Sequence, residues 1–150
     1  PLTTMVPVPP KRLRSPCQRL EARLSPIGPD WDMSRVSLAL QDLSFGDRVF
    51  GWQGVWSPCS RYFAIAEWLS VERVRYPDMQ LLVIDVLKGR ECVVEHVPCG
   101  FIEPLYFHDD TIKYNKIVQG MSERVVLHRP IGELDSWRPP SGRPAETGSP

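Results

Sequence analysis

Long apolar runs are absent from this chain of 150 residues. No run approaches the ~20 apolar residues that a membrane-spanning helix needs, and the N-terminal stretch PLTTMVPVPPKRLR lacks the apolar core of a signal peptide. An excess of charge of one sign is also missing, because 18 Lys and Arg residues balance 18 Asp and Glu residues. Since a neutral chain has no net field to attract nucleic acid or an anionic membrane, we expect neither as a partner.

Cysteine is scarce and forms no Cys-x-x-Cys pair. The four cysteines are Cys17, Cys59, Cys92 and Cys99, too few for a disulfide scaffold in a chain of this length. We therefore expect free thiols and a reducing, cytoplasmic environment. Cys92 and His96 would stand about 13 Å apart on a strand, too far apart to share one zinc ion. No metal or other cofactor is expected.

Helical periodicity is scarce as well, whereas short apolar segments bounded by turn residues are frequent. Strands are predicted at residues 36–40, 48–52, 62–68, 80–86, 91–97, 102–107, 111–118 and 124–128. Segment 80–86 is apolar on both faces, as expected of a central strand covered on both sides. The predicted class is all-β, mainly antiparallel: a blade-like meander that forms an open twisted sheet or a small sandwich.

The two ends of the chain differ in composition from its centre. Residues 1–30 are rich in proline and basic residues and predict an extended arm, with two helical turns at 17–24 that place Leu20 and Leu24 on one face. Residues 31–137 predict a single β domain. Residues 138–150 have almost no apolar side chain to anchor them and predict a disordered tail.

Two motifs carry a resemblance to a known architecture. Residues 56–64, WSPCSRYFA, are similar to the W-S-P-D-G-R-Y-L-A signature of TolB-like and WD-repeat-type β-propeller blades, and residues 82–90, LVIDVLKGR, resemble the hairpin that follows it. The resemblance covers about residues 50–118 and implies an antiparallel meander, without implying a function. Because a closed propeller takes at least four blades of roughly 40 residues, we expect an open sheet. The alternative is a piece of a larger propeller.

Two groups of residues are candidates for catalysis. Cys59 follows a proline in a turn, where an exposed thiol would act as a nucleophile if a base lay beside it. The cluster His108, Asp109 and Asp110 offers acid–base groups or metal ligands. The sequence brings no histidine to Cys59, and the His-Asp-Asp cluster is also typical of a hairpin turn. A small hydrolase is therefore an alternative, and we expect a protein that is not an enzyme.

A protein-binding surface is the preferred functional hypothesis, because tryptophan and tyrosine are enriched at binding hot spots and long loops often carry function. The expected partner-binding residues are Arg73, Arg75, Tyr76, Asp78, Glu103, Tyr106, Asp109 and Asp110. Bacterial toxin-immunity proteins are one class of this size and composition, in which the acidic residues would enter the basic cleft of a toxin domain. The sequence leaves the oligomeric state open.

Overall fold

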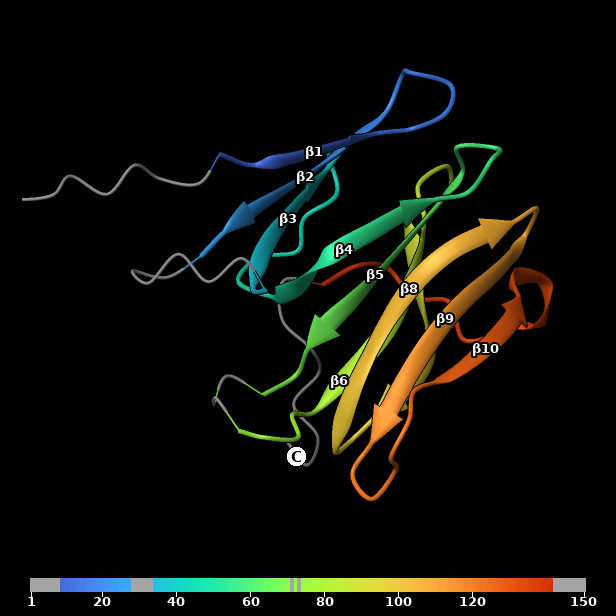
Figure 1. Ribbon diagram of the computed structural model, residues 1–150. Coiled ribbons are helices and arrows are strands. Elements are labelled where there is room, and N and C mark those ends of the chain that lie inside the picture. Colours follow the sequence, from blue (N-terminus) through green and yellow to red (C-terminus); the bar gives the residue numbers. More distant parts are fainter. Residues whose placement is uncertain (1–8, 28–33, 71, 73, 142–150) are drawn as a thin grey trace, which may run out of the picture.

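The computed structural model describes residues 9–27, 34–70, 72 and 74–141, and within them the chain is all-β (Figure 1). Ten strands form two antiparallel sheets, and one 3-10 turn, η1, spans Ile131–Glu133. The predicted fold class, an open, mainly antiparallel β structure, is confirmed. No helix among the described residues has the length and apolar character needed to cross a membrane.

The larger sheet has seven strands that pair in chain order, each antiparallel to the one before it. These strands are β1 (Lys11–Arg14), β2 (Glu21–Pro26), β3 (Val36–Leu40), β4 (Val49–Trp56), β5 (Tyr62–Trp68), β6 (Met79–Asp85) and β7 (Arg90–Val97). The smaller sheet has three strands in the order β10-β9-β8. They are β8 (Gly100–His108), β9 (Thr111–Val118) and β10 (Val125–Pro130).

Strands β5 and β6 lie at the centre of the molecule, because both of their faces are covered. All seven residues of β6 are buried. Alternate side chains such as Leu81 and Val83 join a core with the three-stranded sheet. The intervening side chains Leu82 and Ile84 join a second core with β2 and β3. Since successive residues of a strand point to opposite faces, a strand that is apolar throughout needs cover on both sides.

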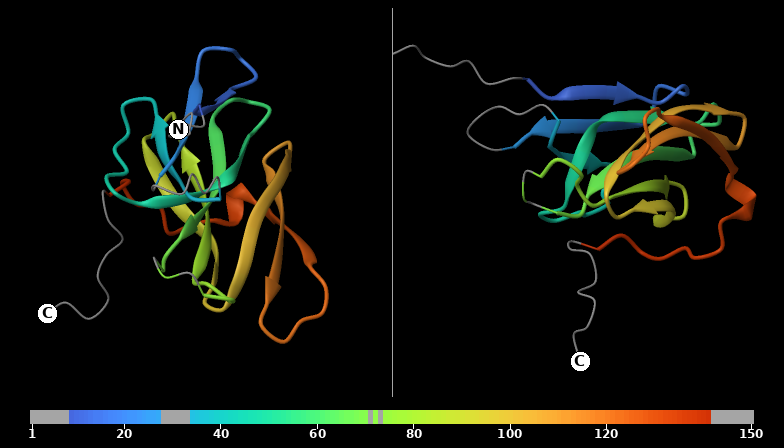
Figure 2. Two further views of the ribbon diagram at one scale, coloured as in Figure 1. Left: turned by 60° about the vertical axis from the view of Figure 1, so that its left-hand side comes forward. Right: turned by 60° about the horizontal axis from the view of Figure 1, so that its bottom comes forward.

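The seven-stranded sheet curls between β3 and β4, so that its own strands β2 and β3 cover one face of β5 and β6. Only one residue pair, Val36 with Phe50, joins these two strands. This weak junction lets β2 and β3 fold over β5 and β6, so that the molecule has three layers of strands (Figure 2). The third layer, β8–β10, packs on the opposite face.

Strand β4 bulges at its middle. Phe50 pairs with Glu67 and Gly54 pairs with Ile65, so the three residues between Phe50 and Gly54 stand opposite Ala66 alone. The bulge lies where β4 packs against β8 across the two sheets. A pocket described below opens at this point.

Most of the predicted strands are confirmed, with β3, β5 and β9 matching their predicted ranges and the others shifted by a few residues. The predicted helical turns at 17–24 are wrong, because β2 begins at Glu21. Ala22 and Leu24 are both fully buried, and this spacing of two residues is the period of a strand. The prediction relied on the spacing of four residues between Leu20 and Leu24, which would place them on one face of a helix. The region predicted as an arm thus contributes two paired strands, β1 and β2.

The first residue of the predicted C-terminal tail, Arg138, is paired with β7. Arg138 exchanges two backbone hydrogen bonds with Glu91 of β7, at 2.8 and 2.9 Å, and its guanidinium lies 3.0 Å from the Glu91 carboxylate. Because the Glu91 side chain is buried, this ion pair holds Arg138 against β7. The composition of residues 138–150 gives no sign of this contact, since it depends on a residue of another strand. Residues 142–150 of the predicted tail lie outside the described residues.

Candidate functional site

The three-stranded sheet presents one face away from the rest of the molecule. Its inner side chains, such as Ile102, Ile112 and Leu127, pack into the core shared with β5 and β6. The opposite side, which we call the outer face, comprises Glu103, Tyr106, Lys113, Asn115, Val126 and His128. Strand pairing arranges them in two rows across the sheet, Glu103–Asn115–Val126 and Tyr106–Lys113–His128.

Exposed apolar side chains gather on this sheet. Among the described residues, five large hydrophobic side chains are exposed, and three of them belong to the three-stranded sheet and its β9–β10 turn. Tyr106 is 50% exposed, Val126 is 63% exposed and Met121 is 38% exposed. The Lys113 ammonium lies 5.6 Å from the centre of the Tyr106 ring, which orients the tyrosine on the surface.

A polar network fixes the first row of the outer face. The Asn115 amide donates to Glu103 Oε1 at 3.2 Å, and its carbonyl accepts from Arg124 Nη1 at 3.0 Å. Asn115 is itself buried, so its amide holds the carboxylate and the guanidinium in a fixed relation. One acidic and one basic group are therefore presented side by side, each with free hydrogen-bonding capacity.

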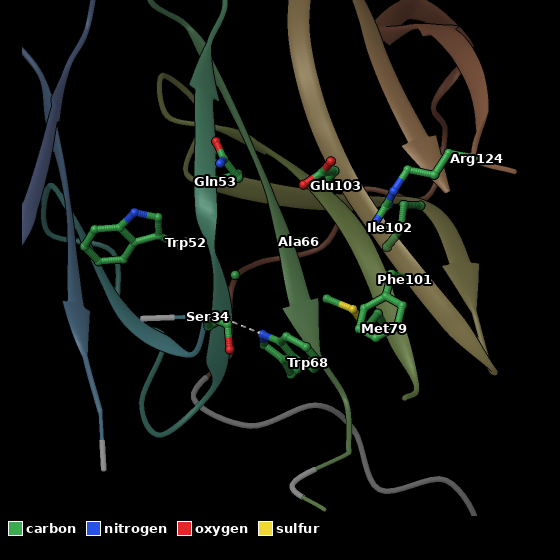
Figure 3. A pocket seen from close by; sticks show the side chains of 11 residues that line it. Ser34, Trp52, Gln53, Ala66, Trp68, Met79, Phe101, Ile102, Glu103 and Arg124 are labelled. Atoms are coloured by element: carbon green, nitrogen blue, oxygen red, sulfur yellow. Dashed lines mark hydrogen bonds between the residues drawn. The ribbon is translucent and has the colours of Figure 1, made fainter. Parts of the chain in front are cut away.

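A pocket of about 170 Å³ adjoins this network, between the β4 bulge and β8. Ala66 and Met79 line it together with the aromatic side chains of Trp68 and Phe101. Figure 3 shows Gln53 and Glu103 at one end of the pocket and Trp68 at the other. The pocket is thus mainly apolar, with polar groups at its Glu103 end, which is the usual composition of a binding site.

Trp68 forms a rigid wall of this pocket. Its indole Nε1 donates to the Ser34 carbonyl at 2.9 Å, and the Phe101 ring meets it edge-on with centroids 6.2 Å apart. The Arg35 guanidinium lies 4.6 Å from the centre of the indole ring. An aromatic side chain held in this way binds a ligand with little further loss of conformational freedom.

The structure places the predicted partner-binding residues in three locations. Glu103 and Tyr106 share the outer face. Asp109 and Asp110 form the β8–β9 turn at one end of β8. Arg75, Tyr76 and Asp78 lie in the β5–β6 loop, which meets the other end of β8 through the Gly100 N–H donating to Pro77 O at 2.9 Å.

These locations do not form one patch, because nine residues of β8 separate the two ends by about 30 Å. In the β5–β6 loop, Asp78 Oδ1 lies 2.5 Å from His96 Nε2 of β7, so this carboxylate is already engaged within the chain. The Arg75 guanidinium lies 5.5 Å from the centre of the Tyr76 ring. Arg73 lies outside the described residues.

The catalytic candidates lie together at the Asp110 end of β8, without a histidine beside the thiol. The Cys59 thiol donates to Asp110 Oδ1 at 3.8 Å and lies 3.3 Å from Ser57 Oγ. His108 Nδ1 lies 3.8 Å from Asp109 Oδ2, and these two side chains are 77% and 92% exposed. Asp109 has φ of 50°, as expected of an aspartate in a tight turn.

In the part of the chain that the structure describes, no group of three or more His, Cys, Asp or Glu side chains is placed so that it could hold a metal ion. Cys92 is buried between the sheets, and this burial raises the pKa of its thiol.

Sequence reasoning missed three residues of the outer face and its rim: Asn115, Arg124 and Val126. The alternation of segment 124–128 would have indicated that Val126 points away from the core. It also missed a repeated motif, because Ser15-Pro16-Cys17 echoes Ser57-Pro58-Cys59 at the turns of two hairpins.

Comparison of the chain with family models, with curated proteins and with solved structures finds no match in any of the three.

Proposed function

We propose that this chain is a non-catalytic protein-binding domain that engages a partner protein through the outer face and the adjoining pocket. The observation that carries the proposal is the gathering of exposed Tyr106 and Val126 beside an aromatic pocket with fixed polar groups. Interfaces combine an apolar centre containing aromatic side chains with a polar rim, and this surface has both parts.

The chemistry of the surface describes the partner segment that fits it. An apolar side chain of the partner enters the pocket and contacts Trp68 and Phe101. A basic group meets Glu103 while an acidic group meets Arg124, because Asn115 holds these two charges next to each other. Mixed charges of this kind set register and specificity more than affinity.

A cytoplasmic toxin inhibitor is the finer form of this proposal. The four cysteines are free thiols, which supports a reducing compartment. Asp109 and Asp110 are exposed in the β8–β9 turn, where they would enter a basic cleft, and Glu103 would contact the partner further along β8. The resemblance to propeller blades remains a prediction.

The experiment compares partner capture by matched single variants of the full chain. Val126→Asp introduces a charge into the outer face, and Tyr106→Ser removes its exposed ring. Leu87→Asp is the control, because Leu87 is 75% exposed but lies in the β6–β7 turn away from this face. Tagged proteins are incubated with lysate of the source cells, and captured proteins are quantified by mass spectrometry.

We expect one protein to be retained by the wild type and by Leu87→Asp, and its recovery to fall about tenfold or more with Val126→Asp and with Tyr106→Ser. Thermal melting of each variant checks that folding is intact. Equal recovery of the same partners by all four proteins would contradict binding through the outer face.

A further inference from the structure

Two hairpin turns of the seven-stranded sheet share the sequence Ser-Pro-Cys and have equivalent hydrogen bonds. In the β4–β5 turn the Ser60 N–H donates to Ser57 O at 3.0 Å, and in the β1–β2 turn the Gln18 N–H donates to Ser15 O at 2.9 Å. Ser60 and Gln18 both adopt positive φ, of 62° and 68°. Each turn therefore presents its cysteine, Cys59 or Cys17, at the equivalent position.

The first serine of each turn also contacts its cysteine. Ser15 Oγ lies 3.3 Å from Cys17 Sγ, and Ser57 Oγ lies 3.3 Å from Cys59 Sγ. The same hydroxyls accept backbone N–H groups from Leu20 at 3.2 Å and from Tyr62 at 3.0 Å. Both thiols are thus held at the surface of rigid turns, and both cysteines are exposed.

The two turns lie against each other although no strand pairing joins them. The Cys17 N–H donates to Ser60 Oγ at 2.8 Å, and Ser60 directly follows Cys59. Cys17 and Cys59 line one pocket of about 370 Å³. The curl of the sheet between β3 and β4 brings the β1–β2 turn to this place.

The Cys17 thiol is activated by its hydrogen bonds. The hydroxyls of Ser15 and Ser60, and then the backbone at Arg19, lower the pKa of Cys17 to about 7. A lowered pKa raises the thiolate fraction of Cys17 near neutral pH, and the thiolate is the nucleophile in disulfide exchange.

We propose that Cys17 and Cys59 form a redox pair, with Cys17 as the attacking thiol and Cys59 as the resolving thiol, which a low-molecular-weight disulfide such as glutathione disulfide oxidises to an internal disulfide. The bond would link the β1–β2 turn to the β4–β5 turn across the shared pocket. It is a modification site distinct from the outer face and does not depend on the proposed binding function.

The oxidation proceeds by two successive thiol–disulfide exchanges. The Cys17 thiolate attacks one sulfur of glutathione disulfide, forming a mixed disulfide and expelling one glutathione thiolate. Cys59 releases its proton to solvent, and its sulfur attacks the Cys17 sulfur, forming the Cys17–Cys59 bond and expelling the second glutathione. Two electrons pass from the protein thiols to the glutathione disulfide, which is reduced to two glutathione molecules after protonation.

The remaining cysteines provide controls within the same chain. Cys99 is exposed but lies in the β7–β8 turn, at the other end of the strands. Cys92 is buried between the sheets. Cys99→Ser therefore leaves Cys17 and Cys59 as the exposed thiols, and this variant is the background for the test.

The experiment incubates the reduced full-length Cys99→Ser chain with glutathione disulfide at pH 7 and follows intact mass and non-reducing peptide maps. We expect the mass to fall by two hydrogen atoms and the Cys17 and Cys59 peptides to be linked. Adding Cys59→Ser should trap glutathione on Cys17, whereas adding Cys17→Ser should slow the first loss of thiol by about threefold or more. The peptide map of the parent chain supplies a result that does not depend on the folding of either added variant.

A parent chain that carries stable glutathione on Cys17 while Cys59 stays reduced would overturn the proposal. Linkage of either cysteine to Cys92, or equal rates of thiol loss with and without Cys17, would overturn it as well.

Discussion

At the scale of single residues, the Asp85 carboxylate shows how a buried charge is stabilised in this fold. Its side chain is fully buried, and it accepts hydrogen bonds from Arg61 and Arg90 at 3.0 Å and from the Lys88 N–H at 3.2 Å. Burial alone would raise the pKa of Asp85, but the hydrogen bonds from Arg61, the Lys88 backbone and Arg90 outweigh burial and lower it. The charged form is therefore favoured by folding.

We expect Asp85 to make stability depend on pH in the acid range. Because its folded pKa lies below the unfolded value of about 3.9, its contribution is present above pH 4 and is lost as the pH falls through the folded pKa. Asp85→Asn should lower the free energy of unfolding at pH 7 by about 2 kcal/mol and flatten its acid dependence. Urea unfolding at pH 7 and at pH 3 measures both effects.

Asp109→Asn is the control for this prediction, because the Asp109 side chain is 92% exposed and asparagine also tolerates its turn conformation. It should change stability little at either pH. An acid dependence that is as steep in Asp85→Asn as in the wild type would show that other carboxylates cause it.

At the scale of elements, the β8–β9 pair depends on a glycine at its start. A Cβ added at Gly100 would lie 2.1 Å from the Ile117 carbonyl oxygen and 2.9 Å from Val118 Cα, which are backbone atoms of β9. We expect Gly100→Ala to lower the free energy of unfolding by about 2–3 kcal/mol, because the strands must separate to admit the methyl group. Denaturant unfolding measures the change.

Gly51→Ala is the matched control in the β4 bulge. The nearest atom to a Cβ at Gly51 is Ala66 Cβ at 3.6 Å, which is ordinary contact, so stability should change by about 0.5 kcal/mol or less. If the two alanine variants unfolded at the same denaturant concentration, close backbone approach at Gly100 would not be the reason for its glycine.

The strand edges of both sheets carry features that discourage pairing with other chains. Three of the four residues of β1, namely Lys11, Arg12 and Arg14, are basic. Pro104 interrupts β8 beside a bulge, and Arg138 covers part of β7. Lys or Arg, proline and bulges are common means of protecting exposed edges. These features limit the pairing of the open edges with other chains.

The sequence predicts the central elements well because their local signals agree with their environment. Strands β5 and β6 are apolar on both faces and are bounded by turn residues, so composition alone identifies them. β1 and β2 are harder to predict, because their burial depends on the curl between β3 and β4, and no local pattern encodes that curl.

The outer face is only partly predictable from the sequence, because it depends on a bulge in β8. Strict alternation would place Glu103 and Tyr106, three residues apart, on opposite faces of β8. The bulge between Pro104 and Tyr106 shifts the register, which brings both side chains to the same face. Glu103 and Tyr106 were predicted as separate candidates, and only the bulge joins them into one surface.

At the scale of the whole molecule, a buried ion network joins the seven-stranded sheet to the C-terminal segment. The Arg48 guanidinium lies 2.8 Å from Glu67 and 2.7 Å from Glu91, with all three side chains at most 1% exposed. It also donates to the Ser141 carbonyl at 3.0 Å, and Gln80 donates to Glu67 at 2.8 Å. Glu67 of β5, Glu91 of β7 and the Ser141 carbonyl thus meet at one cation, and Gln80 of β6 joins the network through Glu67.

We expect Arg48→Met to be strongly destabilising, by about 3–5 kcal/mol, because it leaves two buried carboxylates without their shared cation. Arg12→Met is the control, since Arg12 is 64% exposed and pairs with Glu21 only at 3.7 Å, so its loss should cost about 0.5 kcal/mol or less. Differential scanning calorimetry of both variants measures the difference. Similar melting temperatures would show that the network contributes no more than a surface pair.

The most direct test of the central claim, that the outer face binds a partner protein, is a titration of the purified partner against wild type, Val126→Asp and Leu87→Asp by isothermal calorimetry. The proposed surface predicts that Val126→Asp weakens Kd by about tenfold or more while Leu87→Asp stays within about twofold of wild type. A Val126→Asp chain that is folded and binds with the wild-type Kd would contradict it.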